Sequence, residues 1–309
     1  MDPGPDCPDA RQLLSQVLAA AGLKPSALRA VVLTAWQPER SGLVGWLGGR
    51  FGVTVVARGG ANGMARARAA EALSDQAIMT AARWGGAPAE ARERIAELLQ
   101  ARRAFQPVWR PTAGQRWLDP RPGQGLRLGG GDWVLRQPVL PTAGGSAYWH
   151  AASRSLIGGD VLDRSPGLRL PLPRPLQDWP DIVTLVLASW RQLGRETIDL
   201  VLPAQGAPIR SHRMLIARRL AQLKVGLTAI LDATATEALP PWELLLRLDQ
   251  GGQAGADLPE RLAGLLALVA HLERRGRLRR EGPAAAARFR NSMGGPSLSA
   301  GEGPPGRVG

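Results

Sequence analysis

The sequence predicts an α/β domain followed by a smaller, mostly helical domain. Two short runs rich in β-branched residues, at 30–34 and 53–57, lie on either side of a helical stretch at 42–51, and this alternation predicts parallel strand pairs. After Pro208 the helical stretches become longer and are followed by an arginine-rich segment. With 309 residues and 44% hydrophobic content, the chain is long enough for one large core and a second, smaller one.

The first 210 residues carry further helices on both sides of a group of strands. Helical spacing of apolar residues predicts a helix over 9–21 that Gly22 ends, and an alanine-rich helical stretch over 64–103. Gly85, Gly86 and Pro88 break that stretch into more than one piece.

Short strand-like runs make up the middle of this part. We expect one pair of strands over 125–128 and 133–140, separated by glycines 129–131, and a hairpin over 148–150 and 155–157, closed by Gly158, Gly159 and Asp160. An irregular loop over 165–175, a helix over 178–194 and a last buried strand over 199–202 follow.

Three more helices are predicted after Pro208, over 211–232, 240–248 and 259–275. The segment RGRLRREGPAAAARFR, which ends at Arg290, predicts a basic hairpin, and helices followed by such a hairpin are typical of a winged-helix domain. We therefore predict an α/β domain over 1–210, a long helix and winged-helix domain over 211–290, and a disordered Gly/Pro/Ser-rich tail over 291–309.

Cysteine and histidine are scarce. Cys7 is the single cysteine, so the sequence offers no intrachain disulfide and no thiolate cluster. His150, His212 and His271 lie far apart and show no metal-ligand spacing, and we interpret His212 and His271 as structural. No apolar run approaches the roughly 18 residues that span a bilayer, and the N-terminus does not read as a signal peptide. We expect a cytoplasmic protein with no membrane partner.

The net charge of +13 leaves two interpretations open. Clustered cations release counterions from phosphate, so the charge is compatible with a non-specific nucleic-acid binder. However, arginine is abundant together with alanine, glycine and proline, while lysine is rare, which is typical of a GC-rich coding bias.

One segment carries a specific resemblance. Residues 31–57 read VVLTAWQPERSGLVGWLGGRFGVTVVA, which resembles the signature region of the metallo-β-lactamase superfamily, a strand followed by THxHxDHxG, a helix and another strand. Thr34 and Gly42 frame the motif at matching positions. The four metal-ligand positions between them hold Ala35, Gln37, Glu39 and Arg40.

Three further segments resemble the same superfamily in the same order. DPGPD at 2–6 is similar to the strand end that precedes the first helix, LIGGDVL at 156–162 retains the metal-bridging aspartate as Asp160, and DLVLPAQGAPIR at 199–210 has Gln205 at the last histidine position. A looser alignment places Thr142 at one more histidine position. The likeness continues to about Arg290 and is to the β-lactamase-like protein 2 branch, which has a C-terminal winged helix.

The resemblance implies an αββα sandwich and a zinc-dependent hydrolase, but six of the seven ligand positions are substituted. Only Asp160, with Glu39 as a second candidate, could bind a metal, and with Asp2 or Asp6 nearby they could hold Mg²⁺ weakly. The competing interpretation is that Arg40 pairs with Glu39 or Asp160 and replaces the metal centre by a salt-bridged cluster. We therefore expect no zinc, no cofactor and no catalytic residue.

Three functions remain open at this stage. The first is a non-catalytic member of the superfamily, and the second is an active metal-dependent hydrolase of ester, thioester or phosphodiester bonds. The third is a non-specific nucleic-acid binder whose wing arginines contact phosphate. Those arginines are Arg274, Arg275, Arg277, Arg279, Arg280, Arg288 and Arg290.

Relatives of this branch place two β-hairpins before the DPGP strand, so the chain resembles an N-terminally truncated member. A start codon assigned too far downstream, a decaying gene, or a partner chain that covers the open sheet edge would each explain this. A homodimer is one form that such a partner could take.

Overall fold

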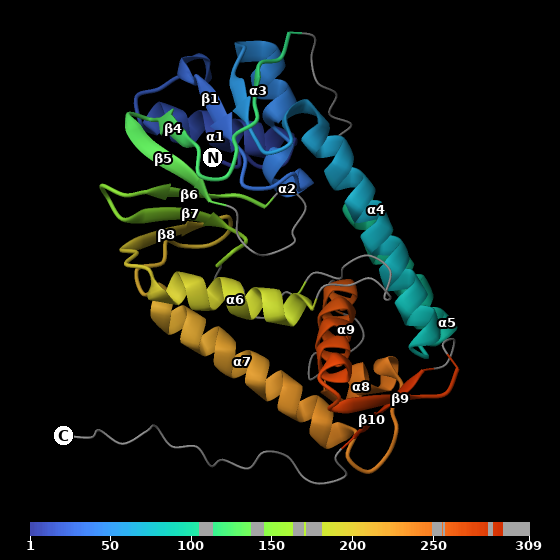
Figure 1. Cartoon of the computed structure of the whole chain (residues 1–309). Coiled ribbons are helices and arrows are strands. Elements are labelled where there is room, and N and C mark those ends of the chain that lie inside the picture. Colours follow the sequence, from blue (N-terminus) through green and yellow to red (C-terminus); the bar gives the residue numbers. More distant parts are fainter. Residues whose placement is uncertain are drawn as a thin grey trace, which may run out of the picture.

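A computed structural model of the chain describes residues 1–104, 114–136, 145–162, 170, 181–248, 255, 257–283 and 287–292. Helices and sheets stack as helix, sheet, sheet and helix, and a second group of helices with a small hairpin lies beside this stack (Figure 1). This arrangement confirms the predicted α/β sandwich.

The first sheet is parallel, as the alternating sequence pattern predicts. Its strands, in order, are β1 (Ala30–Val32), β2 (Thr54–Val56) and β3 (Trp117–Leu118). The helices around it are α1 (Pro8–Ala20), η1 (Pro25–Ala27), α2 (Pro38–Ser41), α3 (Val44–Phe51) and the start of α4 (Gly60–Trp84). Val31 of β1 and Leu33, which directly follows the strand, pack against the helices, while Val32 packs against the second sheet. Successive side chains on a strand point to opposite faces, so this run is apolar throughout because both faces are buried.

The second sheet contains five strands, in the order β4 (Gly125–Leu128), β5 (Gly131–Arg136), β6 (Ala147–His150), β7 (Ser155–Gly159) and β8 (Leu200–Pro203). Neighbours are antiparallel from β4 to β7, and β8 is parallel to β7. Gly158 and Gly159, which we expected to close the β6–β7 hairpin, are instead the last residues of β7, and the turn is made by residues 151–154. Glycine is needed at 159 for another reason, because a Cβ there would lie 2.8 Å from Thr34 of the facing segment.

Two helices cover the outer face of the second sheet. They are α6 (Ile182–Arg195) and α7 (His212–Ala233), and they lie side by side (Figure 1). Val183 and Val186 of α6 and Ile216 of α7 pack on Leu156 and Val201 of the sheet. Most of the predicted loop over 165–175 lies outside the described residues.

A second core joins segments from both sides of residue 210. It contains α5 (Ala89–Ala104), α8 (Pro241–Leu248), α9 (Leu258–Arg274) and the antiparallel hairpin of β9 (Leu278–Glu281) and β10 (Arg288–Asn291). The second half of α4 also packs here, with the end of α7. The backbone N–H of Trp242 donates to the carbonyl of Gly85 at 2.9 Å, which ties the α4–α5 turn to the start of α8.

The three predicted C-terminal helices and the hairpin are therefore present. Asn291, which we assigned to the tail, is the last residue of β10, and its side chain donates to the carbonyl of Leu231. No sequence pattern indicates that α4 and α5 share a core with the C-terminal helices, because residues that pack together here are more than 100 positions apart.

Candidate functional site

The ends of strands from both sheets meet at one place. Thr34 follows β1 of the first sheet, and Asp160 follows β7 of the second. The backbone N–H of Ser146, just before β6, donates to the carbonyl of Thr34 at 2.8 Å, so the two sheets are joined here directly. The short helix α2 then places Arg40 over this junction. We call Asp2, Thr34, Arg40 and Asp160 the central cluster.

Arg40 is the side chain that connects the central cluster. One guanidinium nitrogen, Nη2, forms a salt bridge with Oδ1 of Asp160, and the other, Nη1, donates to Oγ1 of Thr34 at 3.1 Å. Thr34 in turn donates from Oγ1 to Oδ2 of Asp2 at 2.5 Å and from its backbone N–H to Oδ1 of Asp2 at 2.8 Å. The cation thus lies between two segments that each carry a carboxylate, and of the two partners that we considered for Arg40, Asp160 is correct.

The salt bridge between Arg40 and Asp160 is largely buried, and one oxygen of Asp160 takes no part in it. The Arg40 side chain is 6% exposed and the Asp160 side chain 27%. Oδ2 of Asp160 is buried and has no hydrogen-bond partner among the residues that the structure describes. Buried polar atoms are nearly always paired, so an orphaned carboxylate oxygen at the end of a strand calls for an explanation.

Tyr148 of β6 forms the floor between the two sheets. Its hydroxyl donates to the carbonyl of Leu33 at 3.1 Å, and its side chain is fully buried. Burial, assisted by the negative charge of Asp2, raises the pKa of Tyr148 well above its usual range. The group therefore stays protonated and acts as a structural donor, not as a base.

The N-terminal segment that carries Asp2 lies close against the signature segment. The backbone N–H of Asp2 donates to the carbonyl of Val32, and Leu43 donates to the carbonyl of Gly4. A Cβ at Gly42 would lie 2.3 Å from the backbone nitrogen of Asp6. Glycine is thus required at 42 because two backbone segments approach each other closely there. This explains why the position matches the glycine of the motif. Asp6 pairs with Arg11 and does not reach the cluster.

The other predicted ligand positions contribute little to the cluster. Ala35 is buried and has no donor atom, whereas Gln37 and Glu39 are exposed. Gln205 is also exposed, although its loop lies beside Asp160, because the N–H of Ala204 donates to the carbonyl of Gly159 at 3.1 Å. Thr142 lies outside the described residues.

Two solved structures have a fold similar to that of this chain. A metallo-β-lactamase family protein from Thermus thermophilus is 21% identical, with a TM-score of 0.68, over 94% of this chain and 88% of that one. A β-lactamase domain protein from Burkholderia ambifaria is 22% identical, with a TM-score of 0.75, over 94% of this chain and 82% of that one. This chain has the metallo-β-lactamase fold. No family model and no curated protein sequence matches it.

Zinc does not fit the side chains that occupy the metal positions of this metallo-β-lactamase fold. Zinc centres need imidazole, thiolate or carboxylate donors, and a permanently charged guanidinium repels a metal ion. Arg40 lies against the one retained carboxylate, and the part of the chain that the structure describes has no group of three His, Cys, Asp or Glu residues able to hold a metal.

The histidines of this metallo-β-lactamase-fold chain lie away from the cluster. His271 of α9 is buried and hydrogen-bonds through Nδ1 to both carboxylate oxygens of Asp181, at 2.9 and 2.8 Å, which agrees with the structural role that we assigned to it. His212, the first residue of α7, is also buried, and in the described part of the chain its Nε2 has no hydrogen-bond partner. His150 stacks on Trp133 and bonds to Ser153.

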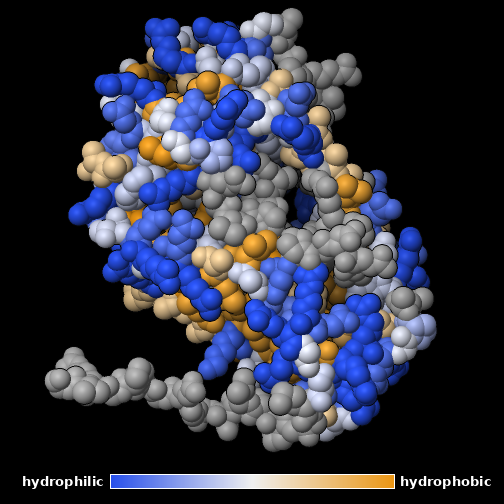
Figure 2. Space-filling view, in the orientation of Figure 1, coloured by the Kyte–Doolittle hydropathy of each residue, from blue (hydrophilic) through white to orange (hydrophobic). Residues whose placement is uncertain are grey.

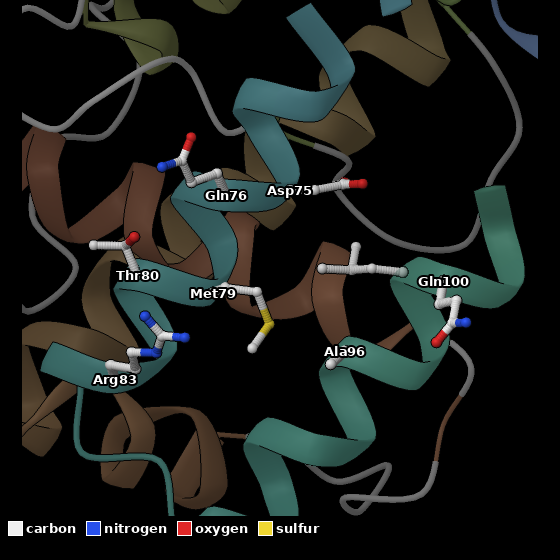
Figure 3. Close-up of a pocket in the computed structure, with 8 residues that line it drawn as sticks. Asp75, Gln76, Met79, Thr80, Arg83, Ala96 and Gln100 are labelled. Carbon is white, nitrogen blue, oxygen red and sulfur yellow. The ribbon is translucent and has the colours of Figure 1, made fainter. Parts of the chain in front are cut away.

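A cavity of about 670 Å³ lies elsewhere, between the second half of α4 and α5 (Figure 3). Met79 points into the gap between the two helices, and the polar side chains of Gln76, Arg83 and Gln100 surround it. The buried carboxylate of Asp75 at one end is held by Arg102 at 2.5 Å. The described residues that line this cavity are all helical, and none of them belongs to the central cluster.

The central cluster and its surroundings contain contacts that the sequence could not indicate. Trp36 donates from Nε1 to the carbonyl of Arg58, and Arg58 donates to the carbonyl of Gly145. Asp2 was identified only as a nearby carboxylate, and its bonds to Thr34 span 32 positions. No spacing rule applies to such contacts, because the packing of the two sheets creates them.

Among the helices that the structure describes, none is long and apolar enough to cross a membrane.

Proposed function

We propose that this protein is a non-catalytic member of the metallo-β-lactamase superfamily, in which the guanidinium of Arg40 supplies the positive charge that a metal ion supplies in the zinc-dependent hydrolases. The observation that carries this proposal is the salt bridge between Arg40 and Asp160. Arg40 also donates to Thr34, so it contacts both sheet ends at once.

The chemistry of the substituted positions supports the same conclusion. A zinc hydrolase of this fold activates a bound water by lowering its pKa, which requires a tightly held dication. Alanine at 35 offers no ligand atom, and glutamine at 37 and 205 offers weak neutral ones. Asp160 is already engaged by a cation that cannot lose its proton.

Metal analysis of the full chain tests this proposal. The protein is incubated with excess zinc or manganese, passed through a desalting column, and its metal content is measured by mass spectrometry. We expect well below one equivalent of either metal. Near-stoichiometric retention of zinc would overturn the proposal.

A variant with the superfamily's residues provides the matched positive control. It combines Ala35→His, Gln37→His, Glu39→Asp, Arg40→His and Gln205→His on the same chain. If this variant retains zinc and the natural chain does not, the substitutions explain the loss. Hydrolysis of an ester or phosphodiester by the natural chain that Asp160→Asn abolishes would instead establish an active enzyme.

We further propose that α8, α9 and the β9–β10 hairpin form a winged-helix domain. Its support is the order of the elements and the fact that the two similar structures cover 94% of this chain, a share that extends beyond the sandwich. The wing arginines have acidic neighbours: Arg279 and Arg290 pair with Glu281, and Arg280 pairs with Glu273. These pairs leave fewer free cations for phosphate, so the nucleic-acid function gains no support from the wing.

A further inference from the structure

The outer face of α7 exposes apolar side chains in a regular stripe. Met214, Ala221 and Val225 lie along one side of the helix at spacings of seven and four residues, and Arg218 lies between Met214 and Ala221 on the same side. Met214 is 70% exposed and Val225 is 68% exposed, the highest values among the large hydrophobic residues that the structure describes. The opposite side of α7 packs on the sandwich, so the exposed stripe is not needed for the fold.

Exposed cations surround this stripe. They are Arg191 and Arg195 near the end of α6, Arg210 before α7, and Arg213, Arg218 and Lys224 on α7. Among the described residues none of these six has a carboxylate partner, and α7 contains no acidic residue before Asp232. Arg213 donates to the carbonyl of Glu196 at 3.3 Å, which places the start of α7 beside the end of α6.

The neighbouring carboxylates do not neutralise these cations. Glu196 is paired with Arg136, and Asp199 is paired with Arg154 at 2.6 Å. Hydrophilic side chains gather over the end of the two helices where α6 ends and α7 begins (Figure 2). Among the described residues, the cations of this corner are therefore not neutralised by carboxylates, in contrast to the wing, where Arg279 pairs with Glu281 and Arg280 with Glu273.

We propose that the stripe on α7 and the cations around it bind the surface of an anionic lipid bilayer. Lipid head groups complement the arginines, and the interfacial layer beneath them accepts short apolar side chains such as Met214 and Val225. The stripe lies on the outward side of a helix, which suits a broad surface more than it suits a peptide that needs a groove. Surface attachment requires no spanning helix. The proposal therefore departs from the sequence expectation of no membrane partner, which rested on the lack of an apolar run long enough to span a bilayer.

Nucleic acid fits the same surface less well. A duplex would contact the cations through phosphate but would leave Met214 and Val225 exposed to water. Single strands bind through stacking on aromatic side chains, and none of the highly exposed large hydrophobic residues that the structure describes is aromatic.

Vesicle co-sedimentation of the full chain tests the proposal. Vesicles of phosphatidylcholine alone are compared with vesicles that contain about one third phosphatidylserine, at low salt. We expect binding only to the anionic vesicles and a steep loss of binding as salt is added. Absence of binding to anionic vesicles at low salt would overturn the proposal.

Two sets of variants separate this surface from overall charge. Arg191→Glu, Arg195→Glu and Arg218→Glu together should weaken vesicle binding at least about 100-fold. Each basic residue near an anionic membrane surface raises the binding affinity about fivefold, and three such residues are lost. The matched control, Arg274→Glu, Arg279→Glu and Arg288→Glu in the wing, has the same net charge and should retain most of the binding. An equal loss in both variants would refute a localised surface.

Substitution of the exposed apolar residues distinguishes binding to lipid from binding to nucleic acid. Met214→Ser with Val225→Ser should lower vesicle binding several-fold without changing the affinity for a DNA or RNA duplex. Circular dichroism checks that each variant keeps the helical content of the natural chain. If the double serine variant binds vesicles as well as the natural chain, or if duplexes are bound through these arginines while vesicles are not, the lipid proposal is wrong.

Discussion

Asp160 and Asp181 are two partly buried carboxylates that each face a basic side chain, and they differ in how fully their oxygens are bonded. Both oxygens of Asp181 are bonded: Thr184 donates its backbone N–H to one and its hydroxyl to the other, and His271 contacts both. Asp160 has one oxygen paired with Arg40, while its Oδ2 is buried and no described residue bonds to it.

The difference reflects where the partners come from. Asp181 caps α6, so two of its donors belong to the first turn of that helix and are present whenever the helix forms. Asp160 stands at a strand end, and its cation comes from a distant part of the chain. The pairing of Asp160 therefore depends on the packing of the two sheets, whereas the cap bonds of Asp181 depend only on its own helix.

Among the substitutions that test this comparison, Arg40→Ala should lower the free energy of unfolding most. It leaves Asp160 partly buried without its cation, and we expect a loss of about 2 to 4 kcal/mol in the free energy of unfolding, below the full value for a buried pair because Asp160 is 27% exposed. Urea denaturation measures the loss. The double variant Arg40→Ala with Asp160→Asn should recover part of it, and a loss below about 1 kcal/mol for Arg40→Ala would show that the pair is unimportant.

Gly42→Ala should have the next largest effect. A Cβ at this position would collide with the backbone of Pro5 and Asp6, and backbone atoms cannot move aside as a flexible side chain can. We expect a destabilisation of about 1 to 3 kcal/mol and displacement of the segment that carries Asp2.

Gly194→Ala in α6 is the matched control for that change. Nothing lies within 4 Å of a Cβ at 194, so the same substitution should stabilise the helix by about 0.5 to 1 kcal/mol. Thermal denaturation of both variants gives the comparison. Similar effects of the same sign would mean that the close approach at Gly42 is not required.

Asp181→Ala should cost less, about 1 to 2 kcal/mol at neutral pH, because it removes a helix cap and the bonds to His271. Burial alone would raise the pKa of Asp181, but the hydrogen bonds from Thr184 and His271 outweigh burial and lower it. A lowered folded-state pKa gives stability that is complete above the pKa of the unfolded carboxyl and is lost as the pH falls through the folded-state value.

The pH dependence provides the measurement for Asp181. The stability difference between the natural chain and Asp181→Ala should be constant near neutrality and shrink in acid, below a pH of about 4. Asp181→Asn, which can still cap the helix, should cost less than alanine. A difference that grew with acid would contradict the lowered pKa.

Much of the fold could be predicted because its signals are local. The β-branched runs that become β1 and β2 are apolar on both faces, and the apolar spacing of α7 and α9 repeats with the helical period. The predicted closure of the β6–β7 hairpin at Gly158 and Gly159 was wrong, because a pair of glycines in a sequence usually indicates a turn. Gly159 is required instead by the close approach of Thr34, which follows a strand of the other sheet.

The sequence by itself determined which side chains stand at the positions that the superfamily resemblance assigns to metal ligands, since the absence of imidazole there is a matter of residue identity. Only the tertiary structure decided which charges meet. Arg40 and Asp160 are 120 positions apart, and their pairing depends on the packing of two sheets. In the same way, folding places Glu273 and Glu281 beside arginines of the wing, whereas no described carboxylate lies beside the exposed arginines of α6 and α7 named above. The physical reason is that an ion pair needs two charges within a few ångströms, and for residues far apart in the sequence only folding brings them that close.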